Sequence, residues 1–332
     1  MENYKYTVCT LCTTFNHVPY VKDALNGFCI QETEFPVVYV IIDDASTDGE
    51  QELLRIWAED NLLMTEEGTA YWNQRNYGEV FYARHLNNHN LFFAIILLNE
   101  NHYSKRKLKF PYFEEWLEKS KYRAICEGDD YWTDCTKLQK QVDFLDSHSE
   151  YSFCVHNFKR YSEKNHVFSE GFRYQEDFSF DVKGYFKYWP TQPLTSLIRT
   201  TAIPSIETRR QYKLYRDNHH YYLLLQKGLG YYMADVMGVY RITNKGMWTS
   251  LDPVGKIEID LKCYLELYQH FPKDKDLRRK CISQYIQYLR TCKENDVDPQ
   301  KEINSEIGLA MKLETWVLIH YSNLRRAIKI MN

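Results

Sequence analysis

Three carboxylates stand close together near the middle of the chain, at Glu127, Asp129 and Asp130. They follow the apolar run Ala124-Ile125-Cys126, which is typical of the end of a buried strand, and Gly128 between them is expected to allow a tight bend. Neighbouring carboxylates repel each other unless a cation lies nearby. Mg²⁺ and Mn²⁺ prefer oxygen ligands and accept phosphate oxygens beside carboxylates. The segment therefore predicts a loop that holds a divalent cation against a diphosphate; an acidic surface turn is the alternative.

A second acidic turn, Asp43-Asp44, stands at the end of another apolar run, Val37 to Ile42. In open α/β sheets, ligands bind at the carboxyl ends of the strands. Two acidic turns in such positions therefore favour a shared binding cleft. A helix-capping turn is the other interpretation, because Ser46 or Thr47 is expected to cap the helix that follows.

Strands and helices alternate through the first part of the chain. The β-branched run from Thr7 to Thr14 predicts a first strand, and Pro19 suits the first turn of the helix after it. Strand, helix, strand and helix in this order form a right-handed unit with parallel strands. Four apolar runs each end in polar or acidic residues and are expected to line one cleft: residues 7–14, 37–42, 91–98 and 124–126.

The whole pattern predicts an α/β fold with a mostly parallel central sheet flanked by helices. Residues 1–250 are expected to form one domain, in which the polar segment 60–90 is a loop with at most one short helix. Helical spacing from about Pro253 predicts a C-terminal helical extension over residues 251–332. Further elements are predicted as follows: helices at 111–119 and after Asp134, strands at 151–156 and 195–199, a helix from Asp217 that Gly228 or Gly230 closes, and an edge strand or hairpin at 231–241.

The last predicted helix, Trp316 to Met331, combines apolar residues with Arg325, Arg326 and Lys329. A helix of this kind can lie on an anionic membrane surface. It can also pack on the domain as an ordinary amphipathic helix, which is the favoured interpretation.

The composition of the 332 residues excludes several classes of protein. A net charge of −3 argues against a nucleic-acid-binding protein. The chain has no G-x-x-x-x-G-K-[ST] loop and no G-x-G-x-x-G turn after the first strand, which argues against an ATPase and a dinucleotide-dependent oxidoreductase. Hydrophobic residues make up 44% of the chain, enough for a sizeable core.

The nine cysteines predict a protein of the reducing cytoplasm. Cys9 and Cys12 form a C-x-x-C pair, but they lie within a strand-like run and no second pair has metal-binding spacing, so we expect buried thiols. The residues from Met1 to Lys5 lack the apolar segment of a secretory signal. No run of 18 apolar residues predicts a transmembrane helix.

Three motifs in this order carry a family resemblance: Thr13 to Asn16, Ile42 to Gly49, and Cys126 to Trp132. Together they resemble the family 2 inverting glycosyltransferases with the GT-A fold, and most of all the bacterial surface-polysaccharide branch. The segment Glu100 to Ser104, the acid Asp217 at the start of an apolar helix, and the turn Tyr240-Arg241-Ile242 add to the likeness. The resemblance covers roughly residues 5–250.

The resemblance implies roles for individual residues on the donor side. Phe15 would stack on the nucleotide base with Thr13 beside it, and Asp44 would bind the base with Asp43 next to it. Asp129 would face the ribose or the sugar of the donor.

Two further roles concern the transfer itself. Asp130 would hold Mn²⁺ or Mg²⁺, and Asp217 would be the general base, with Asp235 as a nearby competitor for that role. Arg241 would contact a phosphate or pair with a surface acid.

The expected function is metal-dependent, inverting transfer of a hexose or N-acetylhexosamine from a nucleotide sugar, here a UDP-sugar, to a glycan or lipid-linked acceptor. The expected place is the cytoplasm, with peripheral membrane contact through the last helix as an option. Two alternatives remain: a nucleotidyltransferase, which also places acids around a metal at strand ends, and a non-catalytic glycan-binding module, which the 28 tyrosines would suit.

Overall fold

A computed structural model describes residues 4–64, 72–243 and 251–319, which belong to two compact units. The first unit consists of the chain up to Phe180 together with Pro190–Ile203 and Lys227–Thr243. The second combines Asp181–Trp189 and Pro204–Gln226 with the described part of Asn244–Asn332. Two segments that precede residue 250 therefore pack with the C-terminal helices, so the compact units do not follow a single cut in the sequence.

Parallel strands form the centre of the sheet in the first unit. Their spatial order is β5, β2, β1, β6, and each neighbouring pair is parallel. All seven residues of β2 are buried, as expected of a strand covered on both faces. These strands match the four apolar runs of the sequence, and the predicted α/β fold is confirmed: β1 (Tyr6–Thr14), β2 (Val37–Asp43), β5 (Leu91–Leu98) and β6 (Ser120–Ile125).

Antiparallel strands extend the sheet on both sides of this centre. The complete order is β10-β12-β8-β11-β6-β1-β2-β5-β4-β3, with β7 paired to β12 and β9 paired to β8. The added strands are β3 (Asn73–Arg75), β4 (Gly78–Arg84), β7 (Tyr131–Trp132), β8 (Tyr151–Ser162), β9 (Val167–Glu170), β10 (Phe178–Phe180), β11 (Leu197–Arg199) and β12 (Leu229–Ile242).

Two predictions about these strands are wrong. The segment 60–90 is not simply a loop, because β3 and β4 form an antiparallel pair that continues onto β5. β12 is not an edge strand, because it lies between β8 and β10.

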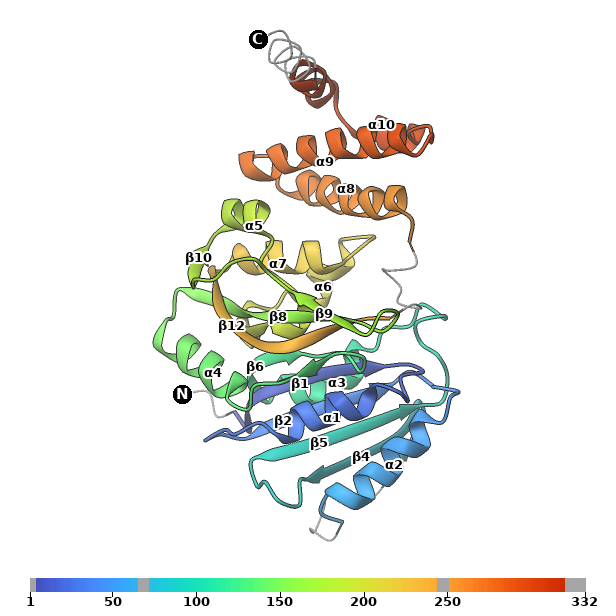
Figure 1. The fold of residues 1–332 in the computed structure, drawn as a ribbon, viewed down its shortest axis with the longest axis vertical. Helices are drawn as coiled ribbons and strands as arrows, with labels where there is room; N and C mark the ends of the chain where they lie inside the picture. Colours follow the sequence, from blue (N-terminus) through green and yellow to red (C-terminus); the bar gives the residue numbers. More distant parts are fainter. Residues whose placement is uncertain (1–3, 65–71, 244–250, 320–332) are drawn as a thin grey trace. The chain divides into compact units, whose positions relative to one another are not determined.

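Helices cover the two faces of the sheet in the first unit (Figure 1). One apolar cluster joins three helices to one face, where Phe28 stacks on Tyr39 with ring centroids 4.6 Å apart. The other cluster packs Phe113, Trp116 and Leu117 of α3 against the opposite face. The three helices of the first cluster are α1 (Val21–Cys29), α2 (Glu50–Asn61) and α4 (Lys137–Ser147), and α3 spans Phe110–Leu117.

The start of α2 differs from the predicted cap. Gly49 is the N-cap residue with φ of 95°, and no side chain caps the helix from that position. The Ser46 hydroxyl instead donates to the Glu50 carboxylate across 2.9 Å. A glycine adopts this left-handed conformation at little cost, so the expected cap by Ser46 or Thr47 is wrong.

The second unit is helical. Its buried cluster includes Tyr222, Leu261, Tyr264 and Tyr288, and residues 309–319 are also helical. The elements are α5 (Val182–Tyr188), α6 (Ile206–Arg210), α7 (Asp217–Leu225), α8 (Pro253–His270), α9 (Lys275–Glu294) and α10 (Lys301–Glu306).

The ends of α7 and the last predicted helix test the sequence-based predictions for this unit. Asp217 opens α7 as expected, but Gln226 is the C-cap residue and Gly230 lies in β12, so the predicted closure by a glycine is wrong. Of the predicted helix 316–331, only the part to residue 319 is described, and Arg325, Arg326 and Lys329 lie outside the described residues.

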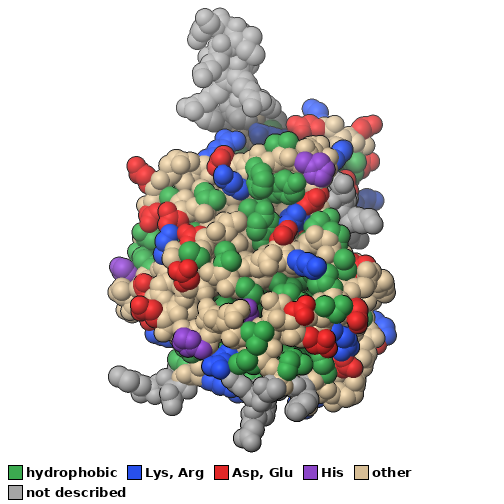
Figure 2. Space-filling view, turned by 60° about the horizontal axis from the view of Figure 1, so that its bottom comes forward, with side chains coloured by type: hydrophobic (Ala, Val, Ile, Leu, Met, Phe, Trp, Pro, Cys, Tyr) green, Lys and Arg blue, Asp and Glu red, His purple; other side chains and the backbone are tan. Residues whose placement is uncertain are grey.

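The surface mixes both signs of charge. Figure 2 shows acidic and basic side chains interspersed on one face of the molecule, together with hydrophobic side chains. All nine cysteines are free thiols, and Cys9 and Cys12 are buried as predicted. Among the helices that the structure describes, none is both long enough and apolar enough to cross a bilayer.

Candidate functional site

Backbone hydrogen bonds bring both acidic turns to the end of β1. The N–H of Asp44 donates to the carbonyl of Thr14 across 2.9 Å, and the N–H of Gly128 donates to the carbonyl of Thr13 across 3.0 Å. The carboxyl ends of parallel strands share one edge of a sheet. Thr13, Asp43, Asp44, Asp129 and Asp130 therefore lie around one strand end, as the sequence predicts; Phe15, directly after the strand, is 42% exposed.

Gly128 is required by lack of space. A Cβ atom at this position would stand 2.3 Å from Thr14 Oγ1 and 2.6 Å from Thr14 Cβ. Among the described glycines, only Gly49 and Gly78 have a positive φ, so Gly128 is not needed for its backbone conformation. The acidic loop can thus lie against β1 only because this residue has no side chain.

The two adjacent acids of this loop have different surroundings. Asp130 is buried and accepts a hydrogen bond from the backbone N–H of Arg241 across 2.8 Å. Burial, followed by the negative charges of Asp129 and Glu127, raises the pKa of Asp130 well above its usual range. The side chain of Asp129 is 21% exposed and approaches His17 Nε2 to 4.0 Å. Asp129 therefore reaches solvent, whereas Asp130 is tied to the neighbouring strand.

Arg241 connects the acidic loop to two other segments. Its Nε donates to the carbonyl of Asp129 across 2.9 Å, and its Nη2 donates to Asp23 across 2.6 Å. Its Nη1 pairs with Glu163. The rings of three tyrosines surround the guanidinium, with centroids 4.9 to 5.7 Å away: Tyr20, Tyr131 and Tyr161.

These contacts bear out the expected pairing of Arg241 with an acid, whereas its contact with a phosphate stays a prediction. The guanidinium pairs with acids of the protein and binds the loop backbone, and the residue is buried. Its partners lie far away along the chain, so no local sequence pattern indicates this arrangement.

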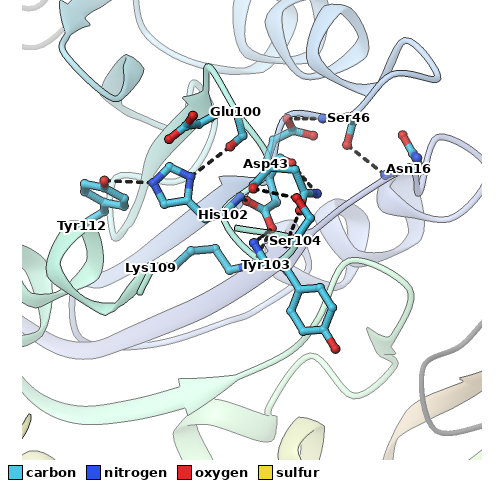
Figure 3. A network of polar contacts seen from close by, with 11 residues as sticks. Asn16, Asp43, Ser46, Glu100, His102, Tyr103, Ser104, Lys109 and Tyr112 are labelled. Carbon is cyan, nitrogen blue, oxygen red and sulfur yellow. Dashed lines mark hydrogen bonds and ion pairs between the residues drawn. The ribbon is translucent and has the colours of Figure 1, made fainter. Parts of the chain in front are cut away.

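Asp44 organises the segment that follows β5. One carboxylate oxygen accepts from the N–H of His102 across 2.7 Å. The other accepts from the N–H of Tyr103 across 3.1 Å and from Lys109 Nζ across 2.8 Å. Burial alone would raise the pKa of Asp44, but these hydrogen bonds outweigh it and lower the pKa below the usual range. Figure 3 shows part of this network, with His102, Tyr103 and Lys109 close together.

His102 extends this network to α3. Its Nδ1 lies 2.9 Å from the carbonyl of Glu100, which can only accept, so this nitrogen carries a proton. Its Nε2 lies 3.1 Å from the Tyr112 hydroxyl (Figure 3). His102 thereby links the loop after β5 to α3.

Asp43 is buried beside this network. One oxygen accepts from the N–H of Ser46 across 3.0 Å and from Gln51 Nε2 across 2.6 Å. The other oxygen has no hydrogen-bond partner among the described residues. Burial raises the pKa of Asp43, although its hydrogen bonds oppose the shift.

Glu50 is a residue of the site that sequence reasoning missed. Its carboxylate accepts from the N–H of His17 across 2.8 Å and from the hydroxyls of Thr14 and Ser46. It therefore holds the turn after β1 in place. Its only sequence signal was its position in the first turn of α2, which suits any acid at a helix start.

A hollow of about 860 Å³ lies beside the loop after β5. It borders the turn between β3 and β4, where Tyr77 stacks on Tyr112 with centroids 4.0 Å apart. The sequence did not predict this hollow because it did not predict β3 and β4. The lining residues are Asn76, Tyr77, Asn99, Glu100, His102, Lys107, Leu108 and Tyr112.

The predicted general base belongs to the second unit. Asp217 is the first residue of α7, where the positive end of the helix dipole favours an ionised acid. Its competitor Asp235 lies in β12 and pairs with Lys140 across 3.0 Å. The role of Asp217 as the base stays a prediction.

The donor set of the acidic loop suits a hard cation. Within the described residues, no three His, Cys, Asp or Glu side chains are grouped as a ready-made metal site. Burial, with the repulsion from Asp129 and Glu127 added to it, raises the pKa of Asp130, and a divalent cation would offset both effects. Carboxylates that supply only part of the ligand shell fit Mg²⁺ or Mn²⁺ when a bound diphosphate supplies the rest.

Comparisons of the sequence find relatives over less than half of the chain. No model of a known protein family matches. Uncharacterized proteins of Mycobacterium bovis and Mycobacterium tuberculosis are 34% identical over 145 residues, which is 43% of this chain and 32% of theirs. The chain thus spans about a third of the length of the curated relatives it matches.

Solved structures share the fold over most of the chain. The structure of Staphylococcus aureus TarS 1–349 has a TM-score of 0.55 at 14% identity. The matched region covers 90% of this chain and 77% of the TarS chain. The same protein in complex with UDP-GlcNAc has a TM-score of 0.52 at 15% identity, and the matched region covers 87% of this chain and 73% of the TarS chain. The architecture is therefore the GT-A type of α/β fold, with helices flanking the central sheet.

Proposed function

We propose that this chain is a glycosyltransferase that moves a sugar from a UDP-sugar to a glycan or lipid-linked acceptor of a surface polysaccharide. The observation that carries the proposal is the convergence of two acidic turns on the end of β1, fixed by the Asp44–Thr14 and Gly128–Thr13 backbone hydrogen bonds. The fold shared with TarS, which has been solved with UDP-GlcNAc and with UDP, supports it. We place the reaction in the cytoplasm, in keeping with nine free thiols.

The nucleotide would bind over the end of β1. The exposed ring of Phe15 is available to stack on the base, with Thr13 beside it. Both oxygens of Asp44 already accept hydrogen bonds from the loop after β5. Asp44 and its neighbour Asp43 would therefore support donor binding mainly by shaping that loop.

The acidic loop would hold Mn²⁺ or Mg²⁺ through Asp129 and Asp130, with Asp129 also facing the ribose or sugar of the donor. The bound cation would neutralise the charge that grows on the departing nucleoside diphosphate. Arg241 and Glu163 keep the loop in place from the side of β12. No acid is needed at the leaving group, because a diphosphate leaves as an anion.

Inversion requires one base that accepts the proton of the acceptor hydroxyl as it attacks the anomeric carbon. We assign this role to Asp217. Its position at the start of α7 favours the ionised form, which is the form that accepts a proton.

The test measures UDP binding by calorimetry with and without Mn²⁺, followed by turnover of a panel of UDP-sugars. We expect metal-dependent UDP binding and slow release of UDP. Asp217→Asn should keep the UDP affinity and lose turnover, whereas the matched control Asp235→Asn should keep both. Release of pyrophosphate instead of UDP would indicate a nucleotidyltransferase, and binding of glycans without nucleotide would indicate a binding module.

A further inference from the structure

Asp217 is an exposed acid on a backbone that is held on both sides. Asn218 and His219, the next two residues of α7, are buried, whereas Asp217 itself is exposed. The chain before Asp217 is a short loop that contains Lys213 and Leu214. Contacts from α8 reach both this loop and the first turn of α7, so the segment around Asp217 is anchored from two directions.

Glu266 of α8 is the residue that contacts both segments. Its Oε1 accepts from the backbone N–H of Lys213 across 2.5 Å, and its Oε2 accepts from that of Leu214 across 3.3 Å. The same Oε2 lies 3.2 Å from Nε2 of His219. Hydrogen bonds from backbone N–H groups to a carboxylate are among the strong ones. Glu266 therefore ties the loop before Asp217 to the first turn of α7.

His219 presents its N–H to this acid. Its Nδ1 accepts from the backbone N–H of Arg216 across 3.4 Å, so the proton of the neutral ring is on Nε2, on the side of Glu266. Burial lowers the pKa of His219 to about 4, although Glu266 opposes the shift. The imidazole is therefore neutral at pH 7 and approaches the carboxylate through its N–H.

Asp260 of α8 holds the residue directly after Asp217. Asn218 Nδ2 donates to Asp260 Oδ1 across 2.9 Å. Asp260 and Glu266 stand three residues on either side of Cys263, and positions three apart are neighbours on a helix surface. Burial raises the pKa of the Cys263 thiol to about 12. Asp217 is among the acids whose charges add to that shift, so it lies near this row of α8.

We infer that α8 positions the general base, because Asp260 and Glu266 fix the backbone on which Asp217 stands. Both are positioning residues, since they act on the segment around Asp217 through contacts within the protein. The inference rests on the proposed function, in which Asp217 accepts the proton of the acceptor hydroxyl. It gives α8 a part in turnover and none in donor binding.

The experiment compares turnover and UDP binding in three variants of the full chain. Asp260→Ala removes the acceptor of the Asn218 amide, and Glu266→Gln replaces one of two accepting oxygens by a donor. A displacement of about 1 Å can lower a rate about 100-fold, so we expect each variant to lower kcat for UDP release from a UDP-sugar by about 10- to 100-fold. KM and the calorimetric Kd of UDP with Mn²⁺ should stay unchanged. Asp260→Asn keeps an acceptor for the Asn218 amide and should restore most of the turnover.

The matched control is Glu258→Ala. Glu258 lies on α8 and accepts from a side-chain amide as Asp260 does, but this amide belongs to Gln300 and not to α7. Its distance to the Glu258 carboxylate is 2.8 Å. This variant should release UDP at the rate of the unsubstituted protein.

Hydrogen exchange tests the anchoring without any substrate. The backbone amides of Lys213 and Leu214 should exchange faster in Glu266→Gln than in the unsubstituted protein, because their acceptor is weakened. Glu258→Ala should leave their exchange unchanged. Equal exchange in the two variants would overturn the anchoring by Glu266.

Three results of the turnover measurement would also overturn the inference. If Asp260→Ala and Glu266→Gln keep full turnover while Asp217→Asn loses it, the base stands and α8 does not position it. If the α8 variants lose UDP affinity as much as turnover, α8 has a general structural role. If Asp217→Asn itself keeps turnover, the assignment of the base in the proposed function fails, and the inference fails with it.

Discussion

The backbone N–H of Arg241 donates to the carboxylate of Asp130 across 2.8 Å, joining residues that are 111 positions apart. The side chain of Arg241 donates a hydrogen bond to the backbone carbonyl of Asp129, the preceding residue of the same loop. One residue of β12 therefore fixes both the backbone and a side chain of the acidic loop. Metal ligands depend on such supporting residues for their orientation.

Replacing Arg241 with lysine should weaken metal-dependent UDP binding about 10- to 100-fold. Lysine keeps the charge but loses the planar fork that reaches Asp23, Glu163 and the loop carbonyl together. Calorimetry with and without Mn²⁺ measures the change. Arg160→Lys is the matched control, because Arg160 also holds backbone carbonyls, but those of Glu170 and Gly171 and not that of the acidic loop. Equal effects of the two substitutions would argue against a role of Arg241 in positioning.

The two acids of the loop should respond differently to substitution by asparagine. Asp129 has a solvent-exposed carboxylate that can bind a cation. Asp129→Asn should therefore lower the rate of metal-dependent donor hydrolysis by a factor of about 10² to 10³. Asp130→Asn should cost less activity and raise the melting temperature, because Asn can still accept from Arg241 while a buried charge is removed. A larger loss of metal affinity in Asp130→Asn would make Asp130 the principal ligand.

Removing the charge of Asp44 should destabilise the protein by about 2–4 kcal/mol, because three donors lose a buried charged acceptor. Urea unfolding of Asp44→Asn measures this loss. The matched control is Glu100→Gln in the same loop, whose carboxylate pairs with Lys105 and Lys107 at the surface. We expect no measurable change in that variant. Comparable losses in both would show that Asp44 is not the organiser of the loop.

Lys137 should make stability depend on pH. Its Nζ is buried 3.7 Å from the centroid of the Trp132 ring and has no hydrogen-bond partner among the described residues. Burial lowers the pKa of Lys137 from 10.5 to about 7, and the nearby Cys126 and Cys154 oppose the shift. Between these values the unfolded chain binds a proton that the folded chain does not, so this group makes the folded state more stable as pH rises from 7 to 10.5.

Lys137→Met should therefore lower the slope of the free energy of unfolding against pH by up to about 1.4 kcal/mol per pH unit. Unfolding in urea at pH 7.5, 8.5 and 9.5 measures the difference between this variant and the unsubstituted protein. Lys140→Met, on the same helix, is the control: Lys140 pairs with Asp134 and Asp235, which raise its pKa, so its loss should leave the slope unchanged over this range. An unchanged slope in Lys137→Met would mean that Lys137 stays charged in the folded state.

The central strands could be predicted because they are buried on both faces. β1, β2, β5 and β6 appear in the sequence as continuous apolar runs, and the acids that follow them stand out by contrast. β4 gave no such signal. Besides Gly78, only the alternate residues Phe81 and Ala83 of this strand are buried, and polar residues flank it on both sides.

The difference in exposure between Asp129 and Asp130 could not be predicted from the sequence. Adjacent residues differ here only through β12, which arrives more than a hundred residues later and covers one of them. The same holds for Gly128, whose need for space depends on Thr14 in another strand. Short-range patterns fix elements, whereas the exposure of a single side chain depends on which distant segment packs over it.

The burial of the cysteines has a practical consequence. Seven of the nine thiols are buried, and burial raises the pKa of those in β1, Cys9 and Cys12, well above the usual range. Alkylating reagents attack the thiolate, so these sulfurs should stay unlabelled for as long as the sheet is closed. The rate at which they take up a reagent then reports how often the centre of the domain opens, without any probe having to be engineered into the chain.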